Sequence, residues 1–109
     1  MALKHAKPGE VVDLRPLGDK LNDAKTAAIV KEASFEAVRL IVPVGREIPS
    51  HRVPGNITLH CLEGRVSLGL KDSEIQLSAG DWVYLAGGEA HSVRGIEDWS
   101  LLLTILLDK

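Results

Sequence analysis

The sequence predicts an all-β domain, an antiparallel β-barrel of the jelly-roll type. Two observations predict it: short apolar runs rich in β-branched residues follow one another from residue 26 onward, and turn-forming residues separate them. The runs recur at intervals of about 8–12 residues, a spacing typical of β-sandwiches and barrels. Within a run the apolar side chains alternate, as at Val38, Leu40 and Val42, so that one face of the strand is directed to a core.

The strands are expected in the following order along the chain. They span 26–31, 35–42, 57–62, 65–70, 74–77, 82–85, 91–96 and 101–107. The breaks between them carry proline, glycine and aspartate, as in Pro54-Gly55, Lys71-Asp72 and Gly87-Gly88. No repeat of fixed period is present, so the chain is not a solenoid.

Residues 1–25 are predicted to form an arm that packs on the barrel, and residues 26–109 to form the single barrel domain. The arm holds too few apolar residues for a core of its own. Within it, residues 10–14 are a candidate short strand, and residues 17–27 a candidate helical turn that Gly18 and Asn22 weaken.

The last predicted strand, 101–107, is apolar on both faces apart from Thr104. One face of a barrel strand is directed outward, and a large exposed apolar patch is rare on a monomer. The arm offers cover only through Val11, Val12, Leu14 and Leu17, which are few and interrupted. We therefore expect a homodimer in which this patch meets its own copy across a twofold axis.

Composition excludes several classes of function. The chain has 109 residues, is 45% hydrophobic and 26% charged, and carries a net charge of −2, which fits one globular domain and not a disordered chain. It lacks the basic cluster of a nucleic-acid-binding protein. Residues 1–10 hold no apolar signal segment, and the longest apolar run is far below the ~20 residues that span a bilayer. With Cys61 alone no internal disulfide is possible, so we expect a cytoplasmic protein without membrane or nucleic-acid partners.

Histidines and glycines recur at two characteristic spacings. The first set is Gly45, His51, Val53, Ile57 and Gly64, and the second is Gly80, Ala86, Gly88, His91 and Gly95. These spacings resemble the two motifs of the cupin superfamily, G-x5-H-x-H-x3-E-x6-G and G-x5-P-x-G-x2-H-x3-N. The resemblance covers about residues 35–108. It implies a cupin-type barrel and supports the expected homodimer, because cupins often pair.

The departures from these motifs concern the metal ligands. A metal-bearing cupin takes two His and one Glu from the first motif and one His from the second. Here Val53 and Ile57 occupy the second His and the Glu positions, and neither side chain can ligate a metal. The resemblance therefore implies that a divalent transition metal (Fe, Mn, Ni or Zn), if bound, is held by His51 and His91 and otherwise by water.

Two further residues are candidate ligands. Cys61 has the strand parity of Ile57 and is expected to face inward, whereas His60 has the opposite parity. A β-bulge at Pro54-Gly55 would exchange these faces. Either side chain, together with His51 and His91, would give nitrogen and sulfur ligands suited to zinc, iron or copper. Cys61 is otherwise an inert core thiol, since no cationic neighbour is evident.

Other side chains with possible roles lie outside the motif positions. Arg39 faces away from Val38 and Leu40, and it is either an anchor for a substrate carboxylate or half of a surface ion pair. Trp82 and Tyr84 share a strand face and are expected to serve packing or an interface.

The site residues leave three functions open. The first is a binding module whose barrel cavity holds a small, largely apolar molecule, with His51 and His91 as polar anchors at the mouth. The second is a metal-dependent enzyme of the dioxygenase or isomerase type, with the same histidines as metal ligands. The third is a stable dimer with a vestigial cavity. The apolar Val53 and Ile57 favour the first and third functions.

Overall fold

The structure is a computed structural model that describes residues 5–42, 44 and 46–107. A short 3₁₀ helix, η1, precedes nine strands. Their bounds are η1 Gly18–Asp23, β1 Ala27–Lys31, β2 Phe35–Val42, β3 Glu47–His51, β4 Ile57–Glu63, β5 Arg65–Gly69, β6 Glu74–Ser78, β7 Trp82–Leu85, β8 His91–Gly95 and β9 Trp99–Leu106. The all-β, jelly-roll prediction is confirmed. Among the described residues, no helix is long and apolar enough to cross a membrane.

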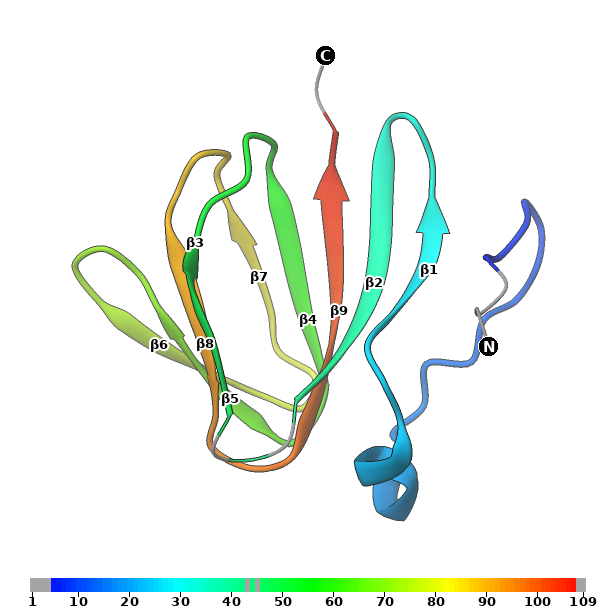
Figure 1. Cartoon of the computed structure of the whole chain (residues 1–109), viewed down its shortest axis with the longest axis horizontal. Helices are drawn as coiled ribbons and strands as arrows, with labels where there is room; N and C mark the ends of the chain where they lie inside the picture. Colours follow the sequence, from blue (N-terminus) through cyan, green and yellow to red (C-terminus); the bar gives the residue numbers. More distant parts are fainter. Residues whose placement is uncertain (1–4, 43, 45, 108–109) are drawn as a thin grey trace.

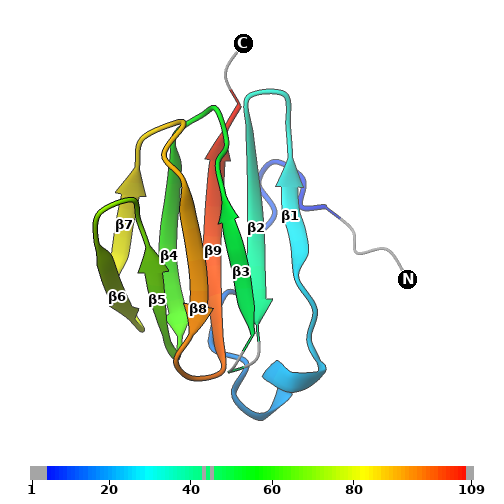
Figure 2. The same ribbon diagram turned by 60° about the vertical axis from the view of Figure 1, so that its left-hand side comes forward.

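The strands form two antiparallel sheets that face each other (Figure 1). Sheet A has the strand order β1-β2-β9-β4-β7, and sheet B has the order β3-β8-β5-β6. Both sheets contain pairs of hydrogen-bonded strands that are distant in sequence, such as β2 and β9. This pairing is the jelly-roll topology. Figure 2 shows the N-terminal segment behind sheet A, on the side away from sheet B.

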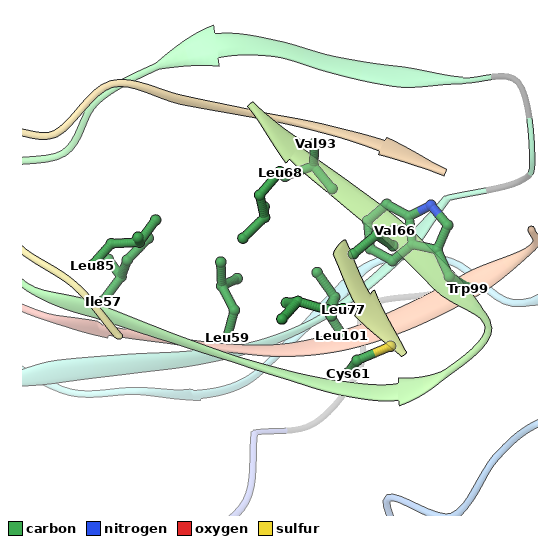
Figure 3. Close-up of a cluster of buried hydrophobic side chains, with 10 residues drawn as sticks. All are labelled: Ile57, Leu59, Cys61, Val66, Leu68, Leu77, Leu85, Val93, Trp99 and Leu101. Atoms are coloured by element: carbon green, nitrogen blue, oxygen red, sulfur yellow. The ribbon is translucent and has the colours of Figure 1, made fainter. Parts of the chain in front are cut away.

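The core fills the space between the sheets, where the alternating side chains of both inner faces meet (Figure 3). Its fully enclosed members come from β4, β5, β6, β7, β8 and β9. They are Ile57, Leu59, Cys61, Val66, Leu68, Leu77, Leu85, Val93, Trp99 and Leu101. Burying each large aliphatic side chain contributes about 1.5–3 kcal/mol, so this cluster supplies most of the stabilisation of the barrel.

One strand was not predicted from the sequence. Residues 47–51 contain Pro49, which argues against a central strand, yet they form β3. Proline is tolerated here because β3 is an edge strand of sheet B and pairs only with β8. On an edge strand, the N–H group that proline lacks is not required for pairing with a second neighbour.

The N-terminal segment corrects two further expectations. Residues 10–14 form no strand; the segment instead meets the sheet through single hydrogen bonds, such as that from the Ala6 N–H to the Ile29 carbonyl at 2.7 Å. Val11 is 93% exposed and Val12 40%, so neither covers the last strand. The predicted helical turn is present as η1.

Candidate ligand site at the mouth of the barrel

His51 and His91 lie opposite each other where β3 ends and β8 begins, the end of the barrel that we call the mouth. Their ring centroids are 4.4 Å apart and the rings are inclined at 59°. His91 belongs to the inner face of sheet B with Val93 and is only 5% exposed, whereas His51 is exposed. The motif spacing predicts this proximity, and the structure agrees. Gly45, which opens the first motif, lies outside the described residues.

A β-bulge directs His51 inward. Ile48 pairs with Val93, and three residues later His51 pairs with His91, only two residues from Val93. Without this extra residue, Ser50 would stand opposite His91 and His51 would take the outer face. The bulge thus brings the two imidazoles together. The possible bulge at Pro54-Gly55 is not present, because that dipeptide lies outside the strands.

Two loops at the mouth are linked by hydrogen bonds. The Gly88 N–H donates to the Val53 carbonyl at 2.8 Å, and the Gly87 N–H donates to Asn56 Oδ1 at 2.8 Å. Gly87 lies so close to the Pro54 carbonyl that a Cβ atom would overlap it. This close approach fixes the loop that leads into His91 against the loop that follows His51.

Both histidines use the same ring nitrogen for a local hydrogen bond. His51 Nδ1 lies 3.0 Å from the Pro49 carbonyl oxygen, and His91 Nδ1 lies 3.1 Å from the Glu89 carbonyl oxygen. A carbonyl only accepts, so each Nδ1 carries the proton. Nε2 is therefore the nitrogen left to meet a ligand, which is the arrangement found in imidazoles that accept a hydrogen bond or bind a metal.

The other motif positions make an apolar wall. Ile57 is 2% exposed in the core, and Val53 is half-buried and packs against the same cluster. Within the described residues, no three His, Cys, Asp or Glu side chains gather in a group that could hold a metal ion. The described residues therefore do not fit the four-ligand metal centre that the cupin motifs imply.

Neither proposed third ligand joins the histidines. Strand β4 keeps its alternation, so Cys61 is enclosed in the core and His60 belongs to the opposite face, beside Trp82 and Leu102. Cys61 lies next to Trp99, at the far end of the core from Ile57 and Leu85 (Figure 3). Burial raises the pKa of the Cys61 thiol to about 11, which keeps it protonated and unreactive.

Arg39 is also separate from the histidines, because it lies on the outer face of sheet A. Its Nη2 is 3.3 Å from Glu63 Oε2, and it also donates to the Arg15 carbonyl at 2.9 Å. Arg39 therefore forms an ion pair, as in one of the two expected alternatives, but not at the surface, because both side chains are almost enclosed. Arg39 cannot anchor a ligand that His51 and His91 bind.

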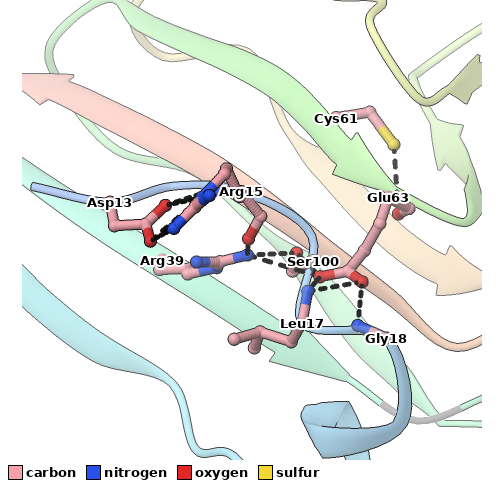
Figure 4. Close-up of polar contacts among 8 residues, drawn as sticks. All are labelled: Asp13, Arg15, Leu17, Gly18, Arg39, Cys61, Glu63 and Ser100. Carbon is pink, nitrogen blue, oxygen red and sulfur yellow. Dashed lines mark hydrogen bonds and ion pairs between the residues drawn. The ribbon is translucent and has the colours of Figure 1, made fainter.

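Glu63 is an organising residue that sequence reasoning missed. Its carboxylate accepts hydrogen bonds from Ser100 Oγ at 2.6 Å and from the Leu17 and Gly18 N–H groups at 3.0 and 3.2 Å (Figure 4). Burial alone would raise the pKa of Glu63, but these donors and Arg39 hold it below its ordinary value. The carboxylate attaches the N-terminal segment to sheet A. Because Glu63-Gly64 is typical of a turn, no sequence pattern marks this role.

The two facing sheets and the two histidine motifs define a double-stranded β-barrel with a reduced ligand set at its mouth. The chain belongs to the cupin family: the cupin-domain family model matches residues 38–105. No curated protein matches the sequence.

Solved structures share the fold at low sequence identity. A conserved protein of unknown function from Streptococcus pyogenes, SPY1581, superposes with a TM-score of 0.79 at 16% identity, over 100% of this chain and 96% of that one. A cupin superfamily protein from Desulfitobacterium hafniense gives 0.74 at 17% identity, over 76% of each chain. The DMSP lyase DddQ from Ruegeria pomeroyi gives 0.69 at 20% identity, over 74% of this chain and 45% of that one. At these identities the likeness concerns the fold alone.

Proposed function

We propose that this cupin is a binding module that holds a small molecule at the mouth of the barrel. The observation that carries the proposal is the pair of imidazoles 4.4 Å apart, each with Nδ1 committed to a backbone carbonyl. Two free Nε2 lone pairs suit a ligand that donates N–H or O–H groups. Val53, which is half-buried, offers apolar contact to the rest of such a ligand.

A second candidate rests on the same Nε2 atoms: a metal-dependent enzyme of the dioxygenase or isomerase type, with His51 and His91 as ligands to Fe, Mn, Ni or Zn. The apolar residues at the other two motif positions weigh against it, because two imidazoles leave most of a coordination sphere to water.

One experiment separates these two candidates. The purified protein and its His51→Ala, His91→Ala and His60→Ala variants are analysed for metals by elemental analysis and for retained small molecules by native mass spectrometry. The binding module predicts a small molecule that is lost in the first two variants and kept in His60→Ala, with no stoichiometric metal. A stoichiometric transition metal lost in the same two variants would instead establish the second candidate.

We also propose that the chain forms a homodimer through the part of the outer face of sheet A that β9, β4 and β7 make, beside the part that the N-terminal segment covers. Trp82 and Tyr84 on β7 are 61% and 53% exposed. They continue two cross-strand rows, Leu102–His60–Trp82 and Thr104–Thr58–Tyr84. This part of the face carries aromatic and apolar groups, the composition of an interface centre, and it can meet its own copy about a twofold axis.

Light scattering tests the dimer. We expect twice the 11.8 kDa mass of one chain at micromolar concentration, and a single-chain mass for Trp82→Glu and Tyr84→Glu. Val11→Glu is the matched control, since Val11 is more exposed than either aromatic and lies on the N-terminal segment. A single-chain mass for the unaltered protein would contradict the proposal.

A further inference from the structure

A second candidate site lies on the opposite side of sheet A from the histidines. A cavity of about 520 Å³ opens between the N-terminal segment and the outer face of the sheet. Its lining comes from both: Asp13, Arg15, Pro16, Leu17, Lys20 and Arg39. The volume is that of pockets that take small molecules.

The cavity has an excess of positive charge. Among the lining residues that the structure describes, three are cations and Asp13 is the one carboxylate. The Glu63 carboxylate offsets the charge of Arg39, with Oε2 3.3 Å from Nη2. Asp13 is bound to Arg15 at 2.8 Å, whereas Lys20 forms no ion pair with any residue that the structure describes. The unbalanced charge at this surface is that of Lys20, and it favours an anion.

Arg39 adds a second, independent observation. Its Nε–H is buried and has no acceptor within the described part of the chain, although Nη2 of the same side chain has three. A buried donor of this kind is normally satisfied, and bound oxyanions often satisfy it in arginine sites. The structure therefore holds a cavity with an excess of positive charge, and its lining residue Arg39 has a buried donor without an acceptor among the described residues.

The Asp13–Arg15 pair is positioned to control access to this donor. Figure 4 shows the pair beside Arg39, and all three residues line the same cavity. The two side chains are 59% and 85% exposed, and ion pairs this exposed to solvent are easily exchanged. An incoming oxyanion can replace the Asp13 carboxylate at Arg15 and reach Arg39.

We propose that this cavity binds a small molecule bearing an oxyanion, a carboxylate or a phosphate, between Arg15, Lys20 and Arg39. The site is distinct from the mouth of the barrel, because it lies on the outer face of sheet A, and it does not depend on the function proposed above. In this arrangement Asp13 competes with the ligand for the cations.

The test uses succinate and inorganic phosphate as probes, with succinamide as the uncharged control. Binding is measured by calorimetry and by the NMR signal of the Arg39 Nε–H group. We expect that signal to move with an oxyanion and not with succinamide. Movement with succinate alone assigns a carboxylate ligand, and movement with phosphate alone assigns a phosphate ligand.

Variants make the test specific. Lys20→Ala should weaken binding about fivefold or more, and Asp13→Asn should strengthen it, because a competing carboxylate is removed. Lys25→Ala, which removes an exposed lysine outside the cavity, should leave binding unchanged. The proposal is overturned if neither probe moves the Arg39 signal, or if Lys25→Ala weakens binding as much as Lys20→Ala does.

Discussion

His51 and His91 face each other across the β3–β8 pair, and both imidazoles donate through Nδ1 to the carbonyl two residues earlier in the chain. The shared pattern has a common cause. Each histidine lies at the point where a loop meets a strand, so its ring folds back onto its own backbone. As a result, both Nε2 atoms lie at the mouth as hydrogen-bond acceptors. A ligand that binds there must therefore donate hydrogen bonds to them.

The first prediction concerns the tautomer of these rings. Nitrogen-detected NMR at about pH 8 should find both His51 and His91 protonated at Nδ1. His5 is exposed on the N-terminal segment and serves as the reference for an unconstrained ring. Protonation of either His51 or His91 at Nε2 would show that the carbonyl contacts do not hold in solution.

The second prediction restores a metal ligand. Val53 occupies the position of the second motif histidine, so Val53→His should add a third imidazole beside His51 and His91. We expect Ni²⁺ or Zn²⁺ affinity to rise by about 100-fold, equivalent to about 2.7 kcal/mol, as measured by calorimetry. Ser50→His is the control, because Ser50 is exposed and the bulge places His51, not Ser50, opposite His91. Equal affinity gains in both variants would contradict the geometry described for the mouth.

Sequence reasoning located the strands of the core well because their signal is local. The alternation in β2 and β4 fixes which side chains face inward, so Cys61 was correctly directed to the core and His60 away from it. The motif spacing likewise placed His51 near His91. These predictions needed only parity and turn residues.

The missed features depend on tertiary context. Pro49 argues against a strand unless the strand is known to be an edge, and edge status belongs to the assembled sheet. Glu63 is a similar case: a shift in register between Cys61 and Glu63 brings its carboxylate to Ser100 on the outer face, where strand parity alone would not direct it. Its other donors, Leu17 and Gly18, are more than forty residues away in sequence.

The third prediction tests the turn between β4 and β5. Gly64 has φ +76°, and a Cβ atom there would overlap the Asp98 carbonyl. Gly64→Ala should therefore destabilise the protein by about 2 kcal/mol or more in urea unfolding. Gly80→Ala has the same kind of backbone, with φ +95°, but open space around it. We expect it to cost about 1–2 kcal/mol, and a Gly64 variant no worse than the Gly80 variant would refute the steric argument.

The fourth prediction concerns the charge of Glu63. Glu63→Gln keeps the shape of the side chain but leaves the nearly enclosed Arg39 without its counter-ion. Removing one partner of such a pair is costly, so we expect a loss of about 2–4 kcal/mol in the free energy of unfolding. Glu97→Gln removes a carboxylate from the half-exposed pair with Arg65 and should cost less than about 1 kcal/mol. Similar losses in the two variants would mean that burial does not increase the contribution of the Glu63–Arg39 ion pair to stability.

The last prediction follows from the lowered pKa of Glu63. A carboxyl group whose pKa is lower in the folded than in the unfolded state stabilises the fold in full above its ordinary pKa of 4.5, and this contribution is lost as the pH falls through the folded value. Protonation also removes the charge of the acceptor and so weakens its hydrogen bonds from the Leu17 and Gly18 N–H groups. As the pH falls below the ordinary value of 4.5, hydrogen exchange at these two amides should therefore accelerate relative to the Leu59 amide in the core, after correction for intrinsic exchange. Glu63→Gln should abolish this pH dependence, because glutamine does not titrate. If the two amides keep their protection in acid while the barrel stays folded, Glu63 does not attach the N-terminal segment to the sheet.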